Sequence, residues 1–276
     1  MNNQIFNWNR FTLALRKEVV ENKRLLMLGA LGIYAVLSLI MIIGNLFFGL
    51  EGSVGIHYVV VFIIFSIGLI ISASLTFRQL KTKVGRIEYF TSPSSTLEKF
   101  LVNAAIYVLG FVLVFFACAQ LADLTRWGMM SCLFSSELLP HVVPGPINFL
   151  GMVHGFVNLV AGNGMLGPEW LEITIWIGMV ASAGLYAMGS ALWPKWSFLK
   201  TYGALYGIET VLGFAMMICV PSSGWEAITD WIHNAVMDGA FFIWFAAFAV
   251  LQAVVFWALA WYLFKHKDVV SLKWWK

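Results

Sequence analysis

The chain reads Arg78-Gln-Leu-Lys-Thr-Lys-Val-Gly-Arg-Ile-Glu-Tyr-Phe-Thr-Ser-Pro-Ser-Ser-Thr-Leu-Glu-Lys-Phe100 between two long apolar runs, at 56–77 and 101–123. The basic residues of this stretch are Arg78, Lys81, Lys83, Arg86 and Lys99. Loops rich in Lys and Arg remain in the cytoplasm when the apolar runs beside them cross a membrane. The stretch therefore predicts a cytoplasmic connection between two membrane-spanning helices.

The end of the same stretch carries a helix-start signal. Ser95 and Glu98 have the spacing of a capping box, in which each side chain accepts a hydrogen bond from a backbone N–H of the first helical turn. Pro93, just upstream, favours an extended entry into that helix. We expect a helix to begin here and to continue directly into the apolar run that follows.

The composition of the chain excludes a soluble domain. Hydrophobic residues make up 61% of the 276 residues and charged residues only 11%, whereas a soluble domain carries about 25% charged residues. The mean hydropathy of +0.83 agrees. A run of about 20 apolar residues crosses the hydrocarbon core of a bilayer. The sequence contains apolar runs of this length at about 25–48, 56–77, 101–123, 171–193, 200–220 and 240–264.

The distribution of Lys and Arg orients these runs. If the N-terminus is cytoplasmic, every Lys and Arg of the chain falls on the cytoplasmic side except Arg126. Adding or removing one span would scramble this partition. We therefore expect an all-α integral membrane protein with six transmembrane helices and both termini in the cytoplasm, organised as a single transmembrane domain over residues 1–276.

Residues 1–24 precede the first apolar run and carry a helical pattern. The apolar side chains that recur at helical spacing are Trp8, Phe11, Leu15 and Val19. Charged residues cluster roughly on the opposite side. This pattern predicts an amphipathic helix that lies in the cytoplasmic interface of the membrane. A solvated helical lead-in to the first span is the alternative.

The connection at 124–170 is the longest one between apolar runs, and its predicted location is external. It is rich in Pro and Gly, yet it is not polar. Within it, 147–161 is apolar but only about 15 residues long, which is too short for a standard span. Two interpretations stay open: a re-entrant or interface-lying helix that caps the outer mouth, or a loop packed on the outer surface.

Glu209 is the one ionisable residue deep inside an apolar run. An acidic side chain at the centre of a membrane costs about 2.5–3.5 kcal/mol, so it should face protein or water rather than lipid. Tyr202 and Tyr206 lie near the same helical face, where their hydroxyls could solvate the carboxyl group. We weigh two roles for Glu209: a residue that lines or gates a transport pathway, and a polar clamp between helices.

The sequence carries no motif for nucleotide chemistry or metal binding. It has no G-x-x-x-x-G-K-[ST] segment, so the chain cannot hold ATP phosphates with a P-loop. The cysteines lack metal or redox spacing, and they fit the role of small apolar residues. His141 and His154 share the external loop, but two histidines are a weak metal signal. We expect no catalytic residue, no metal, no cofactor and no enzymatic activity of the chain itself.

A resemblance appears once the motif and the layout are combined. The segment after the second apolar run reads Pro93-Ser-Ser95-Thr-Leu-Glu98-Lys99-Phe100, a Pro-x-Ser-x-x-Glu-Lys-Phe pattern. With six spans around it, the chain resembles the membrane (permease) subunit of a type-2 ATP-binding-cassette (ABC) transporter, in particular a small bacterial six-span group. The similarity continues in Lys195 and in Phe198-Leu-Lys200-Thr201. Where the family usually reads Leu-Pro-Ala-Ser, this chain has Ser92-Pro93-Ser94-Ser95, which keeps the cap but not the apolar lead-in.

The resemblance implies a function and partners. It implies that the loop between spans two and three is a coupling helix that fits a groove of a separate cytoplasmic ABC ATPase subunit. It also implies a second permease chain, identical or paralogous, export of a substrate, and location in the bacterial cytoplasmic (inner) membrane, with no nucleic-acid partner. The residues expected to couple the chain to the ATPase are Arg86, Pro93, Ser95, Glu98, Lys99 and Phe100.

Three other functions are alternatives. An ion-coupled secondary transporter usually shows paired polar or Gly/Pro-broken spans in two repeats, and this chain has one mid-membrane acid and no such repeat. An intramembrane enzyme needs two or more catalytic groups at one depth, which Glu209 alone does not supply. A non-transporting scaffold or sensor fits the same sequence. The sequence does not name the transported substrate.

Overall fold

The computed structural model describes residues 6–133, 145–161, 168–219, 224, 228–230 and 240–266. Parts of the expected external loop at 124–170, namely 134–144 and 162–167, lie outside these described residues, and so does His141. The described secondary structure is helical throughout. Its elements are α1 (Trp8–Glu21), α2 (Lys23–Ser74), η1 (Arg78–Lys81), α3 (Lys83–Thr91), α4 (Thr96–Ala104), η2 (Ala105–Gly110), α5 (Phe111–Leu133), η3 (Phe149–Gly151), α7 (Met152–Ala161), α8 (Pro168–Leu192), α9 (Ser197–Cys219) and α11 (Ala240–Lys265).

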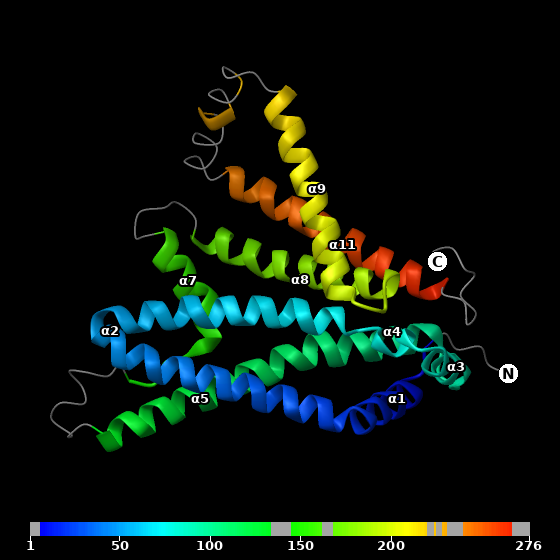
Figure 1. Ribbon diagram of the computed structural model, residues 1–276, viewed down its shortest axis with the longest axis horizontal. Coiled ribbons are helices and arrows are strands. Elements are labelled where there is room, and N and C mark those ends of the chain that lie inside the picture. Colours follow the sequence, from blue (N-terminus) through cyan, green and yellow to red (C-terminus); the bar gives the residue numbers. More distant parts are fainter. Residues whose placement is uncertain are drawn as a thin grey trace. The chain divides into compact units, whose positions relative to one another are not determined.

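Six helical segments within the described residues are long and apolar enough to cross a membrane (Figure 1). They are Lys23–Phe47, Gly55–Ser74, Thr96–Leu133, Leu171–Leu192, Ser197–Cys219 and Ile243–Lys265. The expectation of an all-α, six-span membrane protein is therefore confirmed. We refer to these segments below as the first to the sixth span.

Contacts along the chain divide it into two compact units. Unit 1 comprises Met1–Leu69 and Ser94–Gly162, and unit 2 comprises Ile70–Pro93 and Asn163–Lys276. The division passes through the second span and through the basic stretch at 78–100. The second span and the basic stretch thus each contribute residues to both units, and the single transmembrane domain over 1–276 stays a prediction.

The first half of α2 forms a hairpin with its second half. His57 Nε2 lies 3.1 Å from the carbonyl oxygen of Met41, although a straight helix would place residues 16 apart in sequence about 24 Å apart. A Cβ atom added to Gly44 would lie 3.2 Å from His57 Nε2, so the glycine allows this close approach. Figure 1 shows the two halves of α2 running back along each other. The first and second spans are therefore antiparallel neighbours.

The third span starts at the capped end of α4 and continues through η2 into α5. The connection η2 is a π-helical turn, a feature found mostly as an isolated bulge within α-helices. The helix ends at Leu133 rather than near 123, where the apolar run ends. The third span, Thr96–Leu133, is therefore one continuous helix that begins on the side predicted to be cytoplasmic.

The third span runs parallel to α1 and the first span. The backbone N–H of Asn7 donates to Glu98 at 2.8 Å, and the hydroxyls of Tyr34 and Thr125 lie 2.8 Å apart. The two pairs have the same sequence separation of 91 residues. A constant separation over this length means that the two segments keep one register and point in the same direction.

The helix expected near the N-terminus is present as α1, and part of its apolar stripe is packed. Phe11 and Leu15 contact a buried cluster on the third span, which consists of Val102, Ile106 and Tyr107. Trp8 and Val19 of the same stripe remain 65% and 42% exposed. The N-terminal helix is thus held to the inner end of the third span, and Trp8 is left free to contact a membrane interface.

The short apolar segment of the external loop packs on the second span. The rings of Phe156 and Phe62 stack with centroids 4.3 Å apart, and Phe149 meets Tyr58 edge-on at 5.9 Å. The side chains of Met152, Val153 and Val157 on α7 are almost fully buried. Because Tyr58 and Phe62 belong to the first two turns of the second span, α7 lies beside the outer part of that span.

Unit 2 is centred on α8, which packs along α11. Trp257 of α11 donates its indole N–H to the carbonyl of Val180 at 3.1 Å, and a Cβ at Gly184 would lie 2.8 Å from the Trp257 ring. Phe77 joins this unit because its N–H donates to Ser190 Oγ at 3.0 Å and its ring stacks on Phe264 at 4.7 Å. The inner ends of the second, fourth and sixth spans are thereby held together.

Candidate functional site

Glu98 is the centre of a polar cluster at the inner end of the third span. Its side chain is fully buried. One carboxylate oxygen accepts the N–H of Asn7 at 2.8 Å and lies 3.1 Å from Arg10 Nη2. The other accepts the N–H of Ser95 at 2.8 Å, and Ser95 Oγ accepts the N–H of Glu98 at 3.2 Å. The capping box predicted from the sequence is therefore confirmed, and the same carboxylate also holds α1.

The cluster explains how a carboxylate can be buried here. A carboxylate that loses contact with water must be compensated by hydrogen bonds and an opposite charge. Glu98 has two backbone N–H donors and one guanidinium, and these come from two separate segments of the chain. Removing the carboxylate would leave those backbone donors without their acceptor, so the residue fastens α1 to the start of α4.

Lys99 and Phe100 are also turned into unit 1. Their side chains are 6% and 8% exposed. Three of the residues expected to contact an ATPase, namely Glu98, Lys99 and Phe100, thus lie inside the fold in this conformation. Their part in coupling stays a prediction, and the geometry allows them to act by positioning the helix rather than by touching a soluble partner.

The remaining expected coupling residues are placed differently. Pro93 is exposed, Arg86 is half-buried, and Ser95 is half-buried as the helix cap. Arg86 and Pro93 belong to unit 2, whereas Ser95 belongs to unit 1. The six expected residues are therefore divided between the two units.

The exposed helix of the basic stretch is α3, which sequence reasoning missed. Thr82 caps it by accepting the N–H of Gly85 at 3.1 Å. Val84 and Ile87 are 74% and 51% exposed, and Lys83 beside them is exposed as well. The signal was present, since a Thr cap followed by apolar residues at i and i+3 indicates a short amphipathic helix. α3 offers a small apolar face bordered by cations.

Tyr202, Tyr206 and Glu209 lie on α9, where none of them is buried. The rings of Phe198, Tyr202 and Tyr206 stack in sequence, with centroids 6.3 Å and 6.5 Å apart. Tyr202 and Tyr206 are 55% and 62% exposed, and Glu209 is exposed as well. Glu209 makes no hydrogen bond or ion pair with the described residues. The tyrosines thus stack on one another instead of solvating the carboxyl group.

The fifth span is the least covered of the six. No residue in its most apolar window is buried, whereas half of the fourth span's window is buried. Its first turn is fixed, because Thr201 packs so closely on Gly189 of α8 that a Cβ there would collide with it. Beyond that turn, α9 presents both its apolar side chains and Glu209 outward. In the part of unit 2 that the structure describes, no helix covers this face.

An ion pair in which both partners are buried lies toward the opposite end of the third span. Arg126 Nε donates to Asp123 Oδ1 at 2.7 Å, and both side chains are almost fully buried. Arg126 also donates to the carbonyl of Gly145 at 3.0 Å, while Asp123 Oδ2 accepts the N–H of Ile147 at 2.7 Å. The cation that the sequence placed alone on the outer side is thus a structural residue that holds the external segment onto α5.

Comparison with protein-family models, with curated proteins and with solved structures gives no match for this chain. In the part of the chain that the structure describes, no group of three or more His, Cys, Asp or Glu side chains is placed to hold a metal ion. Three separate features are therefore candidates for function: the Glu98 cluster of unit 1, and the exposed face of α3 and the uncovered face of α9 in unit 2.

Proposed function

We propose that this chain is the permease subunit of an ABC exporter in a bacterial cytoplasmic membrane. In this proposal a separate cytoplasmic ATPase subunit hydrolyses ATP, and the six spans move in response. The six-span architecture, the basic inner side and the Pro93–Phe100 motif support it. The observation that carries it is the Glu98 cluster, because a driven transporter needs a firm connection between its inner surface and its spans.

The Glu98 cluster provides such a connection. The carboxylate fixes the first turn of a helix that continues to Leu133. The same carboxylate holds α1, which is followed after Asn22 by the helix of the first span. A push on this inner end would therefore move the first and third spans together as a rigid body, the kind of motion by which domains and helices switch between states.

We assign the contact with the ATPase to α3. Its exposed apolar residues, Val84 and Ile87, would fill a groove, and the neighbouring cations would pair with acidic side chains of the partner. The buried position of Glu98 and Phe100 suits them to a supporting role. This assignment keeps the expected coupling loop at 78–100 and assigns its contact surface to 83–91, which includes Arg86 of the six expected coupling residues.

We assign the contact with a second permease chain to α9. A carboxylate in the middle of a span should face protein or water rather than lipid, and Glu209 finds no partner among the described residues of its own chain. A second chain placed against α9 would shield Glu209 and the stacked tyrosines. Gly203 and Gly207 leave open space on the helix, and small residues at this spacing permit close helix approach.

Co-purification from native membranes tests the proposed function. The chain should bring down an ATPase subunit, and the double variant Val84→Asp/Ile87→Asp should lose it, because two carboxylates replace the apolar contact. Both residues are exposed, so the variant should fold. Val20→Asp is a matched control, since Val20 is 63% exposed on α1.

Two results would count against this assignment. If the double variant retains the ATPase, α3 is not the contact. If no ATPase accompanies the unaltered chain, the alternatives return: a secondary transporter should then move substrate along an ion gradient in vesicles without ATP, and a scaffold or sensor should not move it at all.

A further inference from the structure

The side of α1 that faces away from the third span carries apolar side chains. Leu13 and Val20 are 66% and 63% exposed. They are seven residues apart, so they lie on one side of the helix. The stripe predicted from the sequence contains Phe11 and Leu15, which contact the buried cluster on the third span. α1 therefore has a second apolar stripe, and the described residues do not cover it.

This second stripe continues into the first span. Met27 follows Val20 by seven residues and is 61% exposed. The helical hydrogen bonds pass through the junction, because the Leu26 N–H donates to the carbonyl of Asn22 at 3.0 Å. Only 11% of the most apolar window of the first span is buried inside the structure, so most side chains of that window face lipid. The second stripe of α1 is thus continuous with the lipid-facing surface of the first span.

α1 nevertheless does not continue the line of the first span. Asn22, between the two helices, has φ of −97° and ψ of 8°, away from the values of a regular α-helix. Figure 1 shows α1 turning away from the first span at this point. Trp8, at the other end of α1, is 65% exposed, and tryptophan is enriched at the headgroup level of membranes. The bend and the exposed apolar residues along its length indicate that α1 lies along the membrane surface.

Cations border the second stripe of α1. The exposed ones that form no ion pair with the described residues are Arg16, Lys23 and Arg24. Arg16 lies on the stripe itself, three residues after Leu13. α1 has two acidic residues: Glu21 pairs with Lys17 at 3.5 Å, and Glu18 is buried. The second stripe therefore combines apolar surface with positive charge that no nearby acid of α1 balances.

We propose that the second stripe of α1 binds anionic phospholipids of the inner leaflet. Leu13 and Val20 would enter the boundary between headgroups and acyl chains, and Arg16 and the two cations at the start of α2 would contact lipid phosphates. An acidic soluble protein would also balance these cations. It would not account for a stripe that is continuous with the lipid-facing surface of the first span, so the continuity favours lipid.

The lipid contact would also act on the third span. The Glu98 carboxylate fastens α1 to the start of α4 through the N–H of Asn7 and the guanidinium of Arg10. A leaflet that holds α1 therefore also holds the inner end of the third span. This contact needs neither an ATPase nor a second permease chain, so it is separate from the contacts proposed for α3 and α9.

An environment-sensitive fluorophore on α1 tests this contact. Leu13→Cys, in a background without the native cysteines, is labelled in the purified full-length chain. The protein is placed in nanodiscs of phosphatidylcholine with increasing fractions of phosphatidylglycerol. We expect the emission to move to shorter wavelengths, and quenching by acrylamide to fall, as phosphatidylglycerol increases. Arg16→Gln/Lys23→Gln/Arg24→Gln should lose this response, since three cations together strengthen binding to an anionic surface about a hundredfold.

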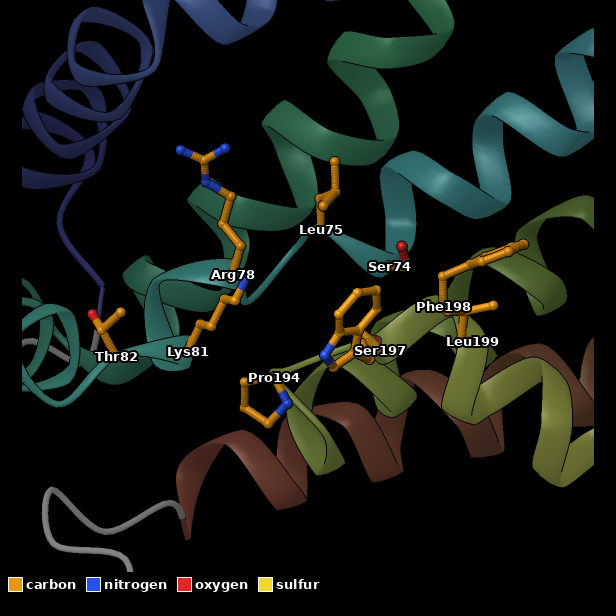
Figure 2. Close-up of a pocket in the computed structure, with 10 residues that line it drawn as sticks. Ser74, Leu75, Arg78, Lys81, Thr82, Pro194, Ser197, Phe198 and Leu199 are labelled. Atoms are coloured by element: carbon orange, nitrogen blue, oxygen red, sulfur yellow. The ribbon is translucent and has the colours of Figure 1, made fainter.

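The matched control removes the same charge from unit 2. It is Lys81→Gln/Lys83→Gln/Lys265→Gln, whose three residues are exposed and belong to unit 2. Lys81 is one of the residues that line a cavity of about 560 Å³ in that unit (Figure 2), and none of the described lining residues belongs to α1. The probe should respond to phosphatidylglycerol in this control as it does without the three substitutions. Arg16→Gln alone should weaken the response about fivefold, and it keeps the test decisive if the triple variant of α1 does not insert.

Three results would overturn the proposal. The first is an emission and a quenching that do not change with the fraction of phosphatidylglycerol. The second is an equal response of Arg16→Gln and the control variant, which would show that the cations of α1 do not bind the lipid. The third is a probe that leaves water only when a cytosolic protein fraction is added, which would assign the second stripe to a soluble partner.

Discussion

Asn7 and Glu98 are 91 residues apart in the sequence, and the N–H of Asn7 donates to the Glu98 carboxylate at 2.8 Å. This contact joins the start of α1 to the first turn of α4. The Glu98 carboxylate also accepts the N–H of Ser95, so it connects α1 with the capped start of α4. The helices that lead into the first and third spans are therefore held together at Glu98, and substitutions there should change the stability of unit 1.

Replacing Glu98 should loosen the inner end of unit 1. Glu98→Gln removes the charge that faces Arg10 and weakens the two backbone hydrogen bonds. We expect a loss of about 2 kcal/mol in stability, below the 3–5 kcal/mol typical of a fully buried ion pair, because Arg10 is partly exposed. Thermal unfolding of the protein in detergent measures this change.

Glu21→Gln is the matched control for Glu98→Gln. Glu21 pairs with Lys17 at 3.5 Å, with both side chains about half exposed, and such exposed pairs contribute about 0.5 kcal/mol or less. Equal unfolding temperatures for Glu98→Gln and Glu21→Gln would show that the buried cluster does not stabilise unit 1.

The Asp123–Arg126 pair should hold the external segment in place. Arg126→Met leaves a buried carboxylate without its cation, and we expect a loss of about 3–5 kcal/mol. The double variant Asp123→Leu/Arg126→Met should lose less than the sum of the single variants, because the two residues interact directly. Unfolding of all three variants gives this coupling, and additive losses would contradict it.

Gly155 should be required for the close packing of α7 on the second span. A Cβ there would lie 2.6 Å from the ring of Tyr58. We expect Gly155→Ala to destabilise the protein by about 1–2 kcal/mol, because the overlap exceeds the gain in helix propensity. Gly128→Ala on α5 is the control, since a Cβ there meets nothing within 4 Å. Its unfolding temperature should stay the same or rise; a larger fall for Gly128→Ala would refute the packing argument.

Glu209 should lie at a contact between two chains. In a background without the native cysteines, Glu209→Cys should form a cross-linked species in native membranes under mild oxidation. Ile67→Cys on the second span, 52% exposed, should cross-link much less. Cross-linking of both cysteines to the same extent, or of Ile67→Cys alone, would rule out α9 as the contact.

Local patterns in the sequence were sufficient for the fold class. The six apolar runs are long and continuous, and length alone identifies them as spans. The capping box of Ser95 and Glu98 could also be predicted, because both partners lie within one helical turn. Both features depend only on residues that are close together in the sequence, so a local sequence pattern is sufficient to predict them.

Long-range contacts could not be predicted in the same way. Nothing near Glu98 in the sequence indicates that its carboxylate also holds Asn7 and Arg10. Charge counting left Arg126 as the one Lys or Arg on the external side, and such counting does not detect its pairing with Asp123 one turn earlier. The exposure of Glu209 depends on where α9 separates from the helices beside it. The periodicity of apolar residues along α9 does not indicate this position. Tertiary packing decided these three outcomes.

Site-directed cross-linking from α3 tests the central claim most directly. Val84→Cys, in a background without the native cysteines, is treated in native membranes with a short bifunctional reagent that also reacts with amines. We predict that it is labelled only from the inner side and is joined to a nucleotide-hydrolysing subunit, more strongly when ATP is bound. Labelling of Val84→Cys from the outer side, or ATP hydrolysis by the purified chain alone, would contradict the account.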